Sequence, residues 1–271
     1  MNKLILANNG IDIGNGTLLV ALGVIAVALA IMGIYGTFMQ WSVFFRYQAN
    51  NRRYISNGRT AKQIAEEMLQ KLGYTDISVR RTSYFWLLIF YKWGNRYSPK
   101  RRSIFLYGNI LNKNTVTAVA IATQKVGLVI QHKNGEKKMK FRAKWELWTR
   151  LAPNMFIPII AFGIAIDVAC FNLAATPFGY ITLGFAILSI VYTIIAFYCM
   201  YLIIPTERRA GELALEKIKA LNLIPAEYIE NVRGLYKAQV NVYIADFVLA
   251  ILNLILDIIY VALKVAASRK R

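Results

Sequence analysis

Four long apolar stretches constrain this chain more than any other feature of its sequence. They are Leu18–Met39, Met155–Leu173, Phe178–Ile204 and Tyr243–Leu263. Each is close to or above the roughly 20 helical residues that cross the core of a bilayer. Lipid offers no partner for backbone N–H and C=O groups, so each stretch is expected to be helical. Apolar residues make up 57% of the chain and charged residues 17%, a balance that favours a membrane protein over an ordinary soluble domain.

Positive charge is concentrated between the first two stretches. The net charge is +19, and residues 46–150 hold 22 of the 33 Lys and Arg residues but only five acids. Because Lys and Arg stay on the cytoplasmic side of a membrane, we expect a multi-pass protein of the cell membrane whose large loops are cytoplasmic. The basic tail at residues 264–271 leaves the orientation of the last stretch open.

Anionic lipid headgroups and other membrane proteins are the expected partners. Nucleic acid is not expected, because no nucleic-acid-binding motif accompanies the charge.

These observations predict an α+β membrane protein that is mostly helical, with about four transmembrane helices and a small cytoplasmic α+β domain. The second and third stretches are joined by only four residues, which predicts a helical hairpin. The predicted parts, in chain order, are an N-terminal tail and anchor (1–45), a basic cytoplasmic domain (46–150), a transmembrane hairpin (151–204), a cytoplasmic helical segment (205–242), and a last transmembrane helix with a basic tail (243–271).

Local signals predict several elements within residues 46–150. Thr60 and Gln63 have the spacing of a capping box, so a helix is expected to begin after Thr60. A second helix, Val116 to about Gln131, is expected to be capped by Asn114 or Thr115. Strands are expected at 77–81, 84–91 and 101–106.

Four polar residues interrupt the apolar stretches. Asp246, Asn253 and Asp257 recur at i, i+7 and i+11, which places them on one narrow face of a helix, and Asp167 lies in the second stretch. Polar groups inside a membrane are costly and usually face the interior of a helix bundle or water. They are consistent with an ion or proton path and with a polar packing seam. No internal repeat of the kind found in transporters is visible.

Two short segments resemble motifs of a known family. Residues 122–132 read Ala-Thr-Gln-Lys-Val-Gly-Leu-Val-Ile-Gln-His, and residues 205–211 read Pro-Thr-Glu-Arg-Arg-Ala-Gly. They resemble Ala-Ala-His-Glu-Val-Gly-His-Ala-Ile-Gln-His and Pro-x-Glu-Phe-Asp-Ala-Ser of the membrane-bound neutral zinc metallopeptidase family of the YugP type. The resemblance runs in pieces over most of the chain after the first apolar stretch. It implies a metallopeptidase-like domain at 46–150 and zinc as the cofactor of the family.

The resemblance also indicates that the zinc-binding motif is degenerate. HExxH works because two His on one helix face bind zinc while the Glu acts as a general base. The resemblance places Gln124 and Leu128 at the two His positions and Lys125 at the position of the base. Glu207 falls on the remaining ligand position and is interpreted as vestigial. Catalytic zinc sites need three protein ligands, so neither catalytic residues nor zinc are expected in this chain.

Three functions remain open from the sequence. The first is a non-catalytic pseudopeptidase that binds or scaffolds membrane proteins, in which Lys125 pairs with Glu207 where zinc would have been. The second is an active membrane metallopeptidase with an unorthodox site built from His132, Gln131 and Glu207. The third is an ion- or lipid-handling membrane protein. The sequence identifies neither the substrate nor the oligomeric state.

Overall fold

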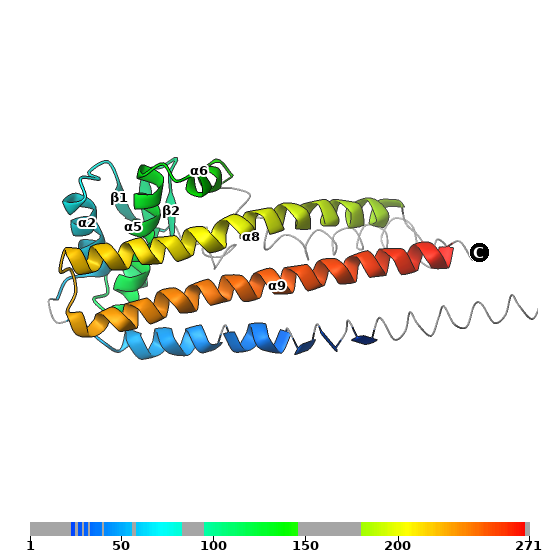
Figure 1. Cartoon of the computed structure of the whole chain (residues 1–271), viewed down its shortest axis with the longest axis horizontal. Coiled ribbons are helices and arrows are strands. Elements are labelled where there is room, and N and C mark those ends of the chain that lie inside the picture. The colour runs from blue at the N-terminus through cyan, green and yellow to red at the C-terminus, as the bar shows by residue number, and fades with distance from the viewer. Residues whose placement is uncertain are drawn as a thin grey trace, which may run out of the picture.

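A small domain of helices and one sheet forms one end of the protein, and two long helices extend from it (Figure 1). This computed structural model describes residues 23–24, 27–28, 30–31, 33–39, 41–55, 58–82, 95–145 and 180–268. The elements are α2 (Ala61–Lys71), β1 (Ser78–Arg81), β2 (Arg96–Ser98), β3 (Ser103–Leu106), α4 (Gly108–Leu111), α5 (Val116–Lys133), α6 (Lys137–Lys144), α8 (Tyr180–Ala220), the 3-10 turn η2 (Ala226–Tyr228) and α9 (Ile229–Ser268). Residues 41–51, here called the N-terminal helix, are also helical.

Both helices predicted from capping signals are confirmed. At the start of α2, the backbone N–H of Gln63 donates to Thr60 Oγ1 (3.3 Å), and the backbone N–H of Thr60 donates to Gln63 Oε1 (2.8 Å). Thr115 caps α5 by accepting a hydrogen bond of 3.3 Å from the N–H of Ala118. Such caps satisfy N–H groups that have no partner within the helix.

The sheet is small and its central strand is β3. The strand order is β1-β3-β2, with β1 parallel and β2 antiparallel to β3. The strands predicted at 77–81 and 101–106 correspond to β1 and β3. The sequence did not predict β2, because three residues are too few to show an alternating pattern. The stretch 84–91 lies outside the described residues.

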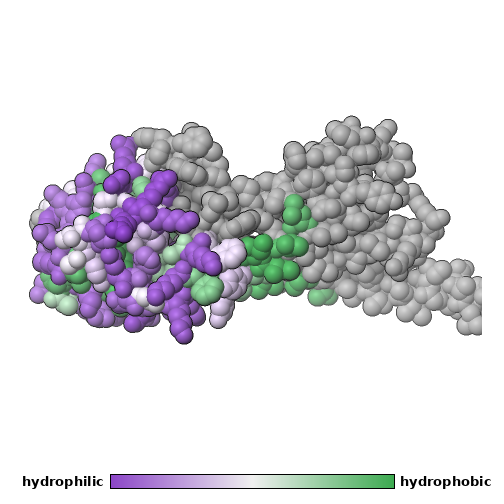
Figure 2. Space-filling model, turned by 90° about the horizontal axis from the view of Figure 1, so that it is seen from above, coloured by the Kyte–Doolittle hydropathy of each residue, from purple (hydrophilic) through white to green (hydrophobic). Residues whose placement is uncertain are grey.

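Helix α5 is the centre of the domain. Its 16 consecutive residues Val116–Gln131 are all buried. It packs against α2 and the sheet, and also against α8 and α9. A helix enclosed on all sides needs apolar residues around its whole circumference, and α5 is mostly apolar. The outer surface of this end of the protein is instead mostly hydrophilic, as Figure 2 shows for one face.

Gly127 allows α5 to approach α8 closely. A Cβ atom at this position would clash with the carbonyl oxygen of Ala210 and would lie 2.7 Å from its carbonyl carbon. These neighbours are backbone atoms of another helix, so they cannot rotate away. The absence of a side chain at residue 127 therefore lets α5, which carries Lys125, lie directly against α8, which carries Glu207.

The structure contradicts the predicted membrane fold. In the part of the chain that the structure describes, no helix combines the length and the apolar character needed to cross a membrane. The α+β membrane fold with about four transmembrane helices is therefore corrected to a mostly helical α+β fold with a three-stranded sheet. The expected multi-pass location in the cell membrane, with cytoplasmic loops, is wrong on the same finding.

Two of the apolar stretches fall in long helices. Residues 180–204 of the third stretch form much of α8, whose 41 residues run on into a charged segment, and Tyr243–Leu263 lies within the 40 residues of α9. The two helices pack side by side, and apolar residues such as Leu202 and Ile203 are buried. Met155–Leu173, with Asp167, lies outside the described residues, and Leu18–Met39 is described only in part.

Replacing Gly127 with Ala is expected to destabilise the protein strongly. The added methyl group must push α5 and α8 apart, and overpacking of this kind costs about 1–3 kcal/mol or more. The control is Gly234→Ala in α9, where a Cβ would meet only Arg46 Nη1 at an ordinary 3.6 Å. That control is expected to be neutral or to gain up to about 1 kcal/mol from helix propensity. Urea unfolding of both variants measures the difference, and equal stability would show that the close approach is unimportant.

Candidate functional site

Glu207 lies at the point where α8 passes α5 and α6, and it is bonded by two cations. Lys125 Nζ of α5 lies 3.1 Å from Glu207 Oε2. Arg142 Nη2 of α6 lies 2.6 Å from Glu207 Oε1. The side chains of Glu207 and Lys125 are only 1% and 3% exposed, and that of Arg142 is 18% exposed. Each carboxylate oxygen therefore has its own positively charged donor in a buried setting.

Thr206 extends this cluster to the backbone of α8. Arg142 Nη1 donates to Thr206 Oγ1 at 2.7 Å, so one guanidinium binds two consecutive residues of α8. Gln131 Nε2 donates to the carbonyl oxygen of Thr206 at 2.7 Å. Thr206 of α8 is therefore hydrogen-bonded to α6 through Arg142 and to α5 through Gln131. We call the group formed by Lys125, Arg142 and Glu207 the ion cluster.

The ion cluster sets the ionisation of its members. Burial alone would raise the pKa of Glu207, but attraction to Lys125 and Arg142 and their hydrogen bonds lower it to about 2. Burial lowers the pKa of Lys125, and Glu207 opposes this effect while Arg142 adds to it, with a net result below the ordinary value. Glu207 is therefore a carboxylate at neutral pH, bonded on both oxygens.

Two tyrosines on further helices lie close enough to Glu207 to feel its charge. Burial raises the pKa of Tyr47, and the negative charge of Glu207 raises it further; the same two causes act first on Tyr243. Tyr47 belongs to the N-terminal helix and Tyr243 to α9. Both remain neutral phenols, so neither supplies a base near Glu207.

The two other positions of the expected motif carry no charge. Leu128 is 2% exposed and Gln124 is 0% exposed. Neither the Nε2 nor the Oε1 atom of Gln124 has a hydrogen-bond partner among the residues described. Leaving buried polar atoms unbonded costs about 1–3 kcal/mol, so an amide at this position is not explained by packing.

A comparison with protein families identifies the family of the chain. The family described as "putative neutral zinc metallopeptidase" matches residues 23–262. The chain belongs to this zinc metallopeptidase family. Comparison with curated proteins gives no match, and comparison with solved structures gives none. The resemblance seen in the sequence is thus confirmed for the family, whereas the loss of its zinc motif stays a prediction.

The residues at the ion cluster do not fit the zinc ion of this metallopeptidase family. Leu128 has no atom that can bind a metal, the ammonium of Lys125 repels a cation, and both oxygens of Glu207 are bonded. Zinc takes Cys, His, Asp or Glu ligands, and four ligands in total are usual. Across the described ranges, no group of three or more such residues could hold a metal ion.

The alternative ligands are not brought together as a site. His132 Nδ1 lies 3.0 Å from the hydroxyl oxygen of Tyr97, and burial followed by repulsion from Lys133 and Lys140 lowers the pKa of His132. Gln131 is bonded to Thr206 instead. Gln131 is thus connected to Glu207 through Thr206 and Arg142, whereas His132 has Tyr97 as its partner.

The predicted polar site in the apolar stretches stays untested. Asp246, Asn253 and Asp257 lie on α9, but their side chains fall outside the description, as does Asp167 entirely. Conversely, the sequence did not indicate Arg142, Tyr47 or Tyr243. Arg142 belongs to a run of basic residues, and spacing alone could not show which of them turns inward.

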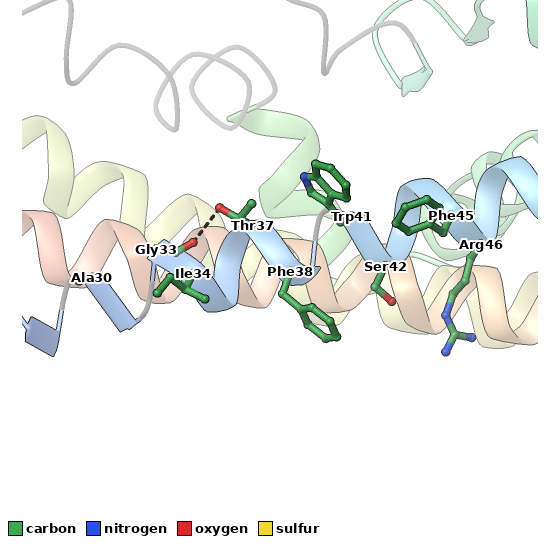
Figure 3. Close-up of a pocket in the computed structure, with 9 residues that line it drawn as sticks. All are labelled: Ala30, Gly33, Ile34, Thr37, Phe38, Trp41, Ser42, Phe45 and Arg46. Carbon is green, nitrogen blue, oxygen red and sulfur yellow. Dashed lines mark hydrogen bonds between the residues drawn. The ribbon is translucent and has the colours of Figure 1, made fainter.

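A groove on the N-terminal side of the chain has a lining without catalytic side chains. This groove has a volume of about 910 Å³ and is lined by nine described residues between Ala30 and Arg46. Figure 3 shows these residues and the hydrogen bond from the Thr37 hydroxyl to the carbonyl oxygen of Gly33, which is 2.8 Å long. Its described lining is mostly apolar, and Arg46 is the charged member. The lining residues are Ala30, Gly33, Ile34, Thr37, Phe38, Trp41, Ser42, Phe45 and Arg46. None of these can act as a general base or as a zinc ligand.

Neutralising Glu207 is expected to destabilise the fold strongly. Glu207→Gln keeps the shape but leaves two inward-facing cations without a carboxylate, and such a loss typically costs about 3–5 kcal/mol. Glu212→Gln is the matched control on α8, because Glu212 is exposed and its partner in the described part of the chain is Arg209, in a surface contact. The control is expected to cost less than about 1 kcal/mol. Similar urea midpoints for the two variants would contradict a structural role for the ion cluster.

The contribution of Glu207 is expected to vanish in acid. Its pKa is lowered from 4.5 to about 2, so its stabilising effect is complete above pH 4.5 and is lost as pH falls toward 2. The difference in unfolding free energy between the wild type and Glu207→Gln should therefore shrink over this range. Glu67 and Asp76, whose pKa values are lowered chiefly by hydrogen bonds from Lys71 and Lys133, titrate in both proteins and cancel. A difference that stays constant from pH 4.5 to pH 2 would contradict the assignment.

Proposed function

We propose that this protein is a non-catalytic member of its family, a pseudopeptidase that binds other proteins without cleaving them. The observation that carries the proposal is the pairing of Glu207 with both Lys125 and Arg142. Glu207 falls on the family's remaining zinc-ligand position, and here its two oxygens are bonded to side-chain cations. The carboxylate is therefore used to hold helices together instead of a metal.

Electrostatics argue against zinc at this place. A zinc ion would have to displace Lys125 and Arg142 from Glu207 and then remain near both cations. Two unit charges at about 4 Å interact with about 4 kcal/mol when the effective dielectric constant is about 20, and zinc carries a double charge. One carboxylate cannot offset this repulsion, since a catalytic site normally supplies three ligands.

The chemistry of peptide hydrolysis is also missing. In an HExxH enzyme the Glu accepts a proton from the zinc-bound water, and the metal polarises that water. The matching position is Lys125, whose ammonium donates to Glu207. A cation that is already engaged as a donor cannot accept that proton.

The buried amide of Gln124 supports an inherited pocket. Packing alone would favour an apolar side chain there, because its amide atoms lack partners in the described part of the chain. A polar residue at a former ligand position fits a helix that once faced a metal. The ion cluster then retains the geometry of α5, α6 and α8, which suits a protein whose function is binding.

Metal analysis tests the proposal directly. The purified wild-type protein is expected to contain no stoichiometric zinc and to cleave no peptide. The triple variant Gln124→His, Lys125→Glu, Leu128→His is expected to gain zinc, because it restores two imidazoles beside Glu207 and removes one competing cation. The control Gln124→His, Leu128→His keeps Lys125 and should bind zinc much more weakly.

Stoichiometric zinc in the wild type, with peptide cleavage that a chelator abolishes, would overturn the proposal. That result would instead support an active metallopeptidase with an unorthodox site. The wild-type measurement decides this point even where a variant fails to fold.

A further inference from the structure

A groove with a basic rim runs between α8 and α9. Its volume is about 570 Å³. The two helices contact each other along this part of the chain. Neither Glu207 nor the other two members of the ion cluster line this groove. The residues that give it its character are Arg208, Gly211 and Leu215 of α8, and Arg233, Tyr236 and Lys237 of α9.

The floor of the groove is apolar and firmly held. Tyr236 is 6% exposed, and its hydroxyl lies 2.7 Å from Thr123 Oγ1 of α5. Gly211 leaves room for this ring, because a Cβ there would lie 3.1 Å from the Cβ of Tyr236. Leu215 continues the floor along α8. The floor is therefore a fixed part of the domain core and needs no rearrangement to accept a ligand.

The rim carries cations that are available to a ligand. Arg208 and Lys237 are exposed, and no hydrogen bond or ion pair of either is found within the described ranges. Arg233 pairs with Glu230 at 2.8 Å, and the acidic rim residue Glu212 pairs with Arg209 at 3.4 Å. The two cations without a partner flank the apolar floor and define a site for negative charge.

The dimensions favour a short extended chain. Arg208 and Leu215 are seven residues apart, which corresponds to about 10 Å along a helix. An extended peptide advances about 3.3 Å per residue, so about three residues span this distance. A bare phosphate would leave the apolar floor uncovered, and Glu212 on the rim would repel a dense polyanion.

We propose that this groove binds a short acidic peptide segment of a partner protein. Carboxylates of the segment pair with Arg208 and Lys237, while a neighbouring apolar side chain covers Tyr236 and Leu215. Rim charges of this kind act chiefly on the association rate and give binding that weakens with salt. The absence of zinc at Glu207 is not required for this interaction.

The test uses the full chain and a fluorescent peptide of alternating Glu and Leu, with a Gln and Leu peptide as the neutral counterpart. The acidic peptide is expected to bind, and the neutral peptide is expected to bind about tenfold more weakly or not at all. The double variant Arg208→Glu, Lys237→Glu should lose about tenfold or more in affinity for the acidic peptide.

The control variant Lys100→Glu, Lys219→Glu changes the net charge by the same amount at exposed positions outside the groove. It is expected to keep most of the affinity. Should the Glu variant not fold, as judged by circular dichroism, the milder pair Arg208→Gln, Lys237→Gln is compared with Lys100→Gln, Lys219→Gln, which changes the net charge by the same smaller amount. Equal losses in the groove and control variants, or equal binding of both peptides, would overturn the proposal. A zinc-containing wild type would overturn the pseudopeptidase proposal and leave this result unaffected.

Discussion

The pairing of one buried carboxylate with two cations connects the parts of this domain. Glu207 joins α8 to α5 through Lys125 and to α6 through Arg142. A buried charge without a counter-charge is strongly unfavourable, so the three elements can separate only together. The close approach at Gly127 makes this pairing possible, because it brings the backbone of α5 against that of α8. The close contact at Gly127 and the ion pair of Lys125, two residues earlier on α5, thus depend on each other.

The sequence predicted the elements whose causes are local. A capping box needs only Thr60 and Gln63, and a helix N-terminus needs only Thr115, so both were recognised from spacing. The parallel pairing of β1 with β3 depends on contacts between distant segments, and β2 is too short to produce a pattern. Local signals therefore predicted the helices of the domain better than its sheet.

The apolar stretches and the ion cluster show two limits of reading a sequence. Hydropathy counts apolar side chains but does not reveal what covers them, and in α8 and α9 part of that apolar surface packs against the neighbouring helix. The likeness to the family's motif led to Lys125 and Glu207, which the structure places 3.1 Å apart. Arg142 was missed because the basic run at 137–144 offers several equivalent cations, and only the fold selects the one that reaches Glu207.

The ion cluster carries more positive than negative charge. Lys125 and Arg142 contribute two cations and Glu207 contributes one anion, so the net charge of the cluster is +1. Burial alone would raise the pKa of Glu207, but attraction to both cations and their hydrogen bonds lower it to about 2, so the anion persists at neutral pH. The negative charge of Glu207 in turn helps to raise the pKa values of Tyr47 and Tyr243, which keeps these nearby phenols neutral. Because each carboxylate oxygen faces its own cation, the cluster stabilises one particular arrangement of α5, α6 and α8.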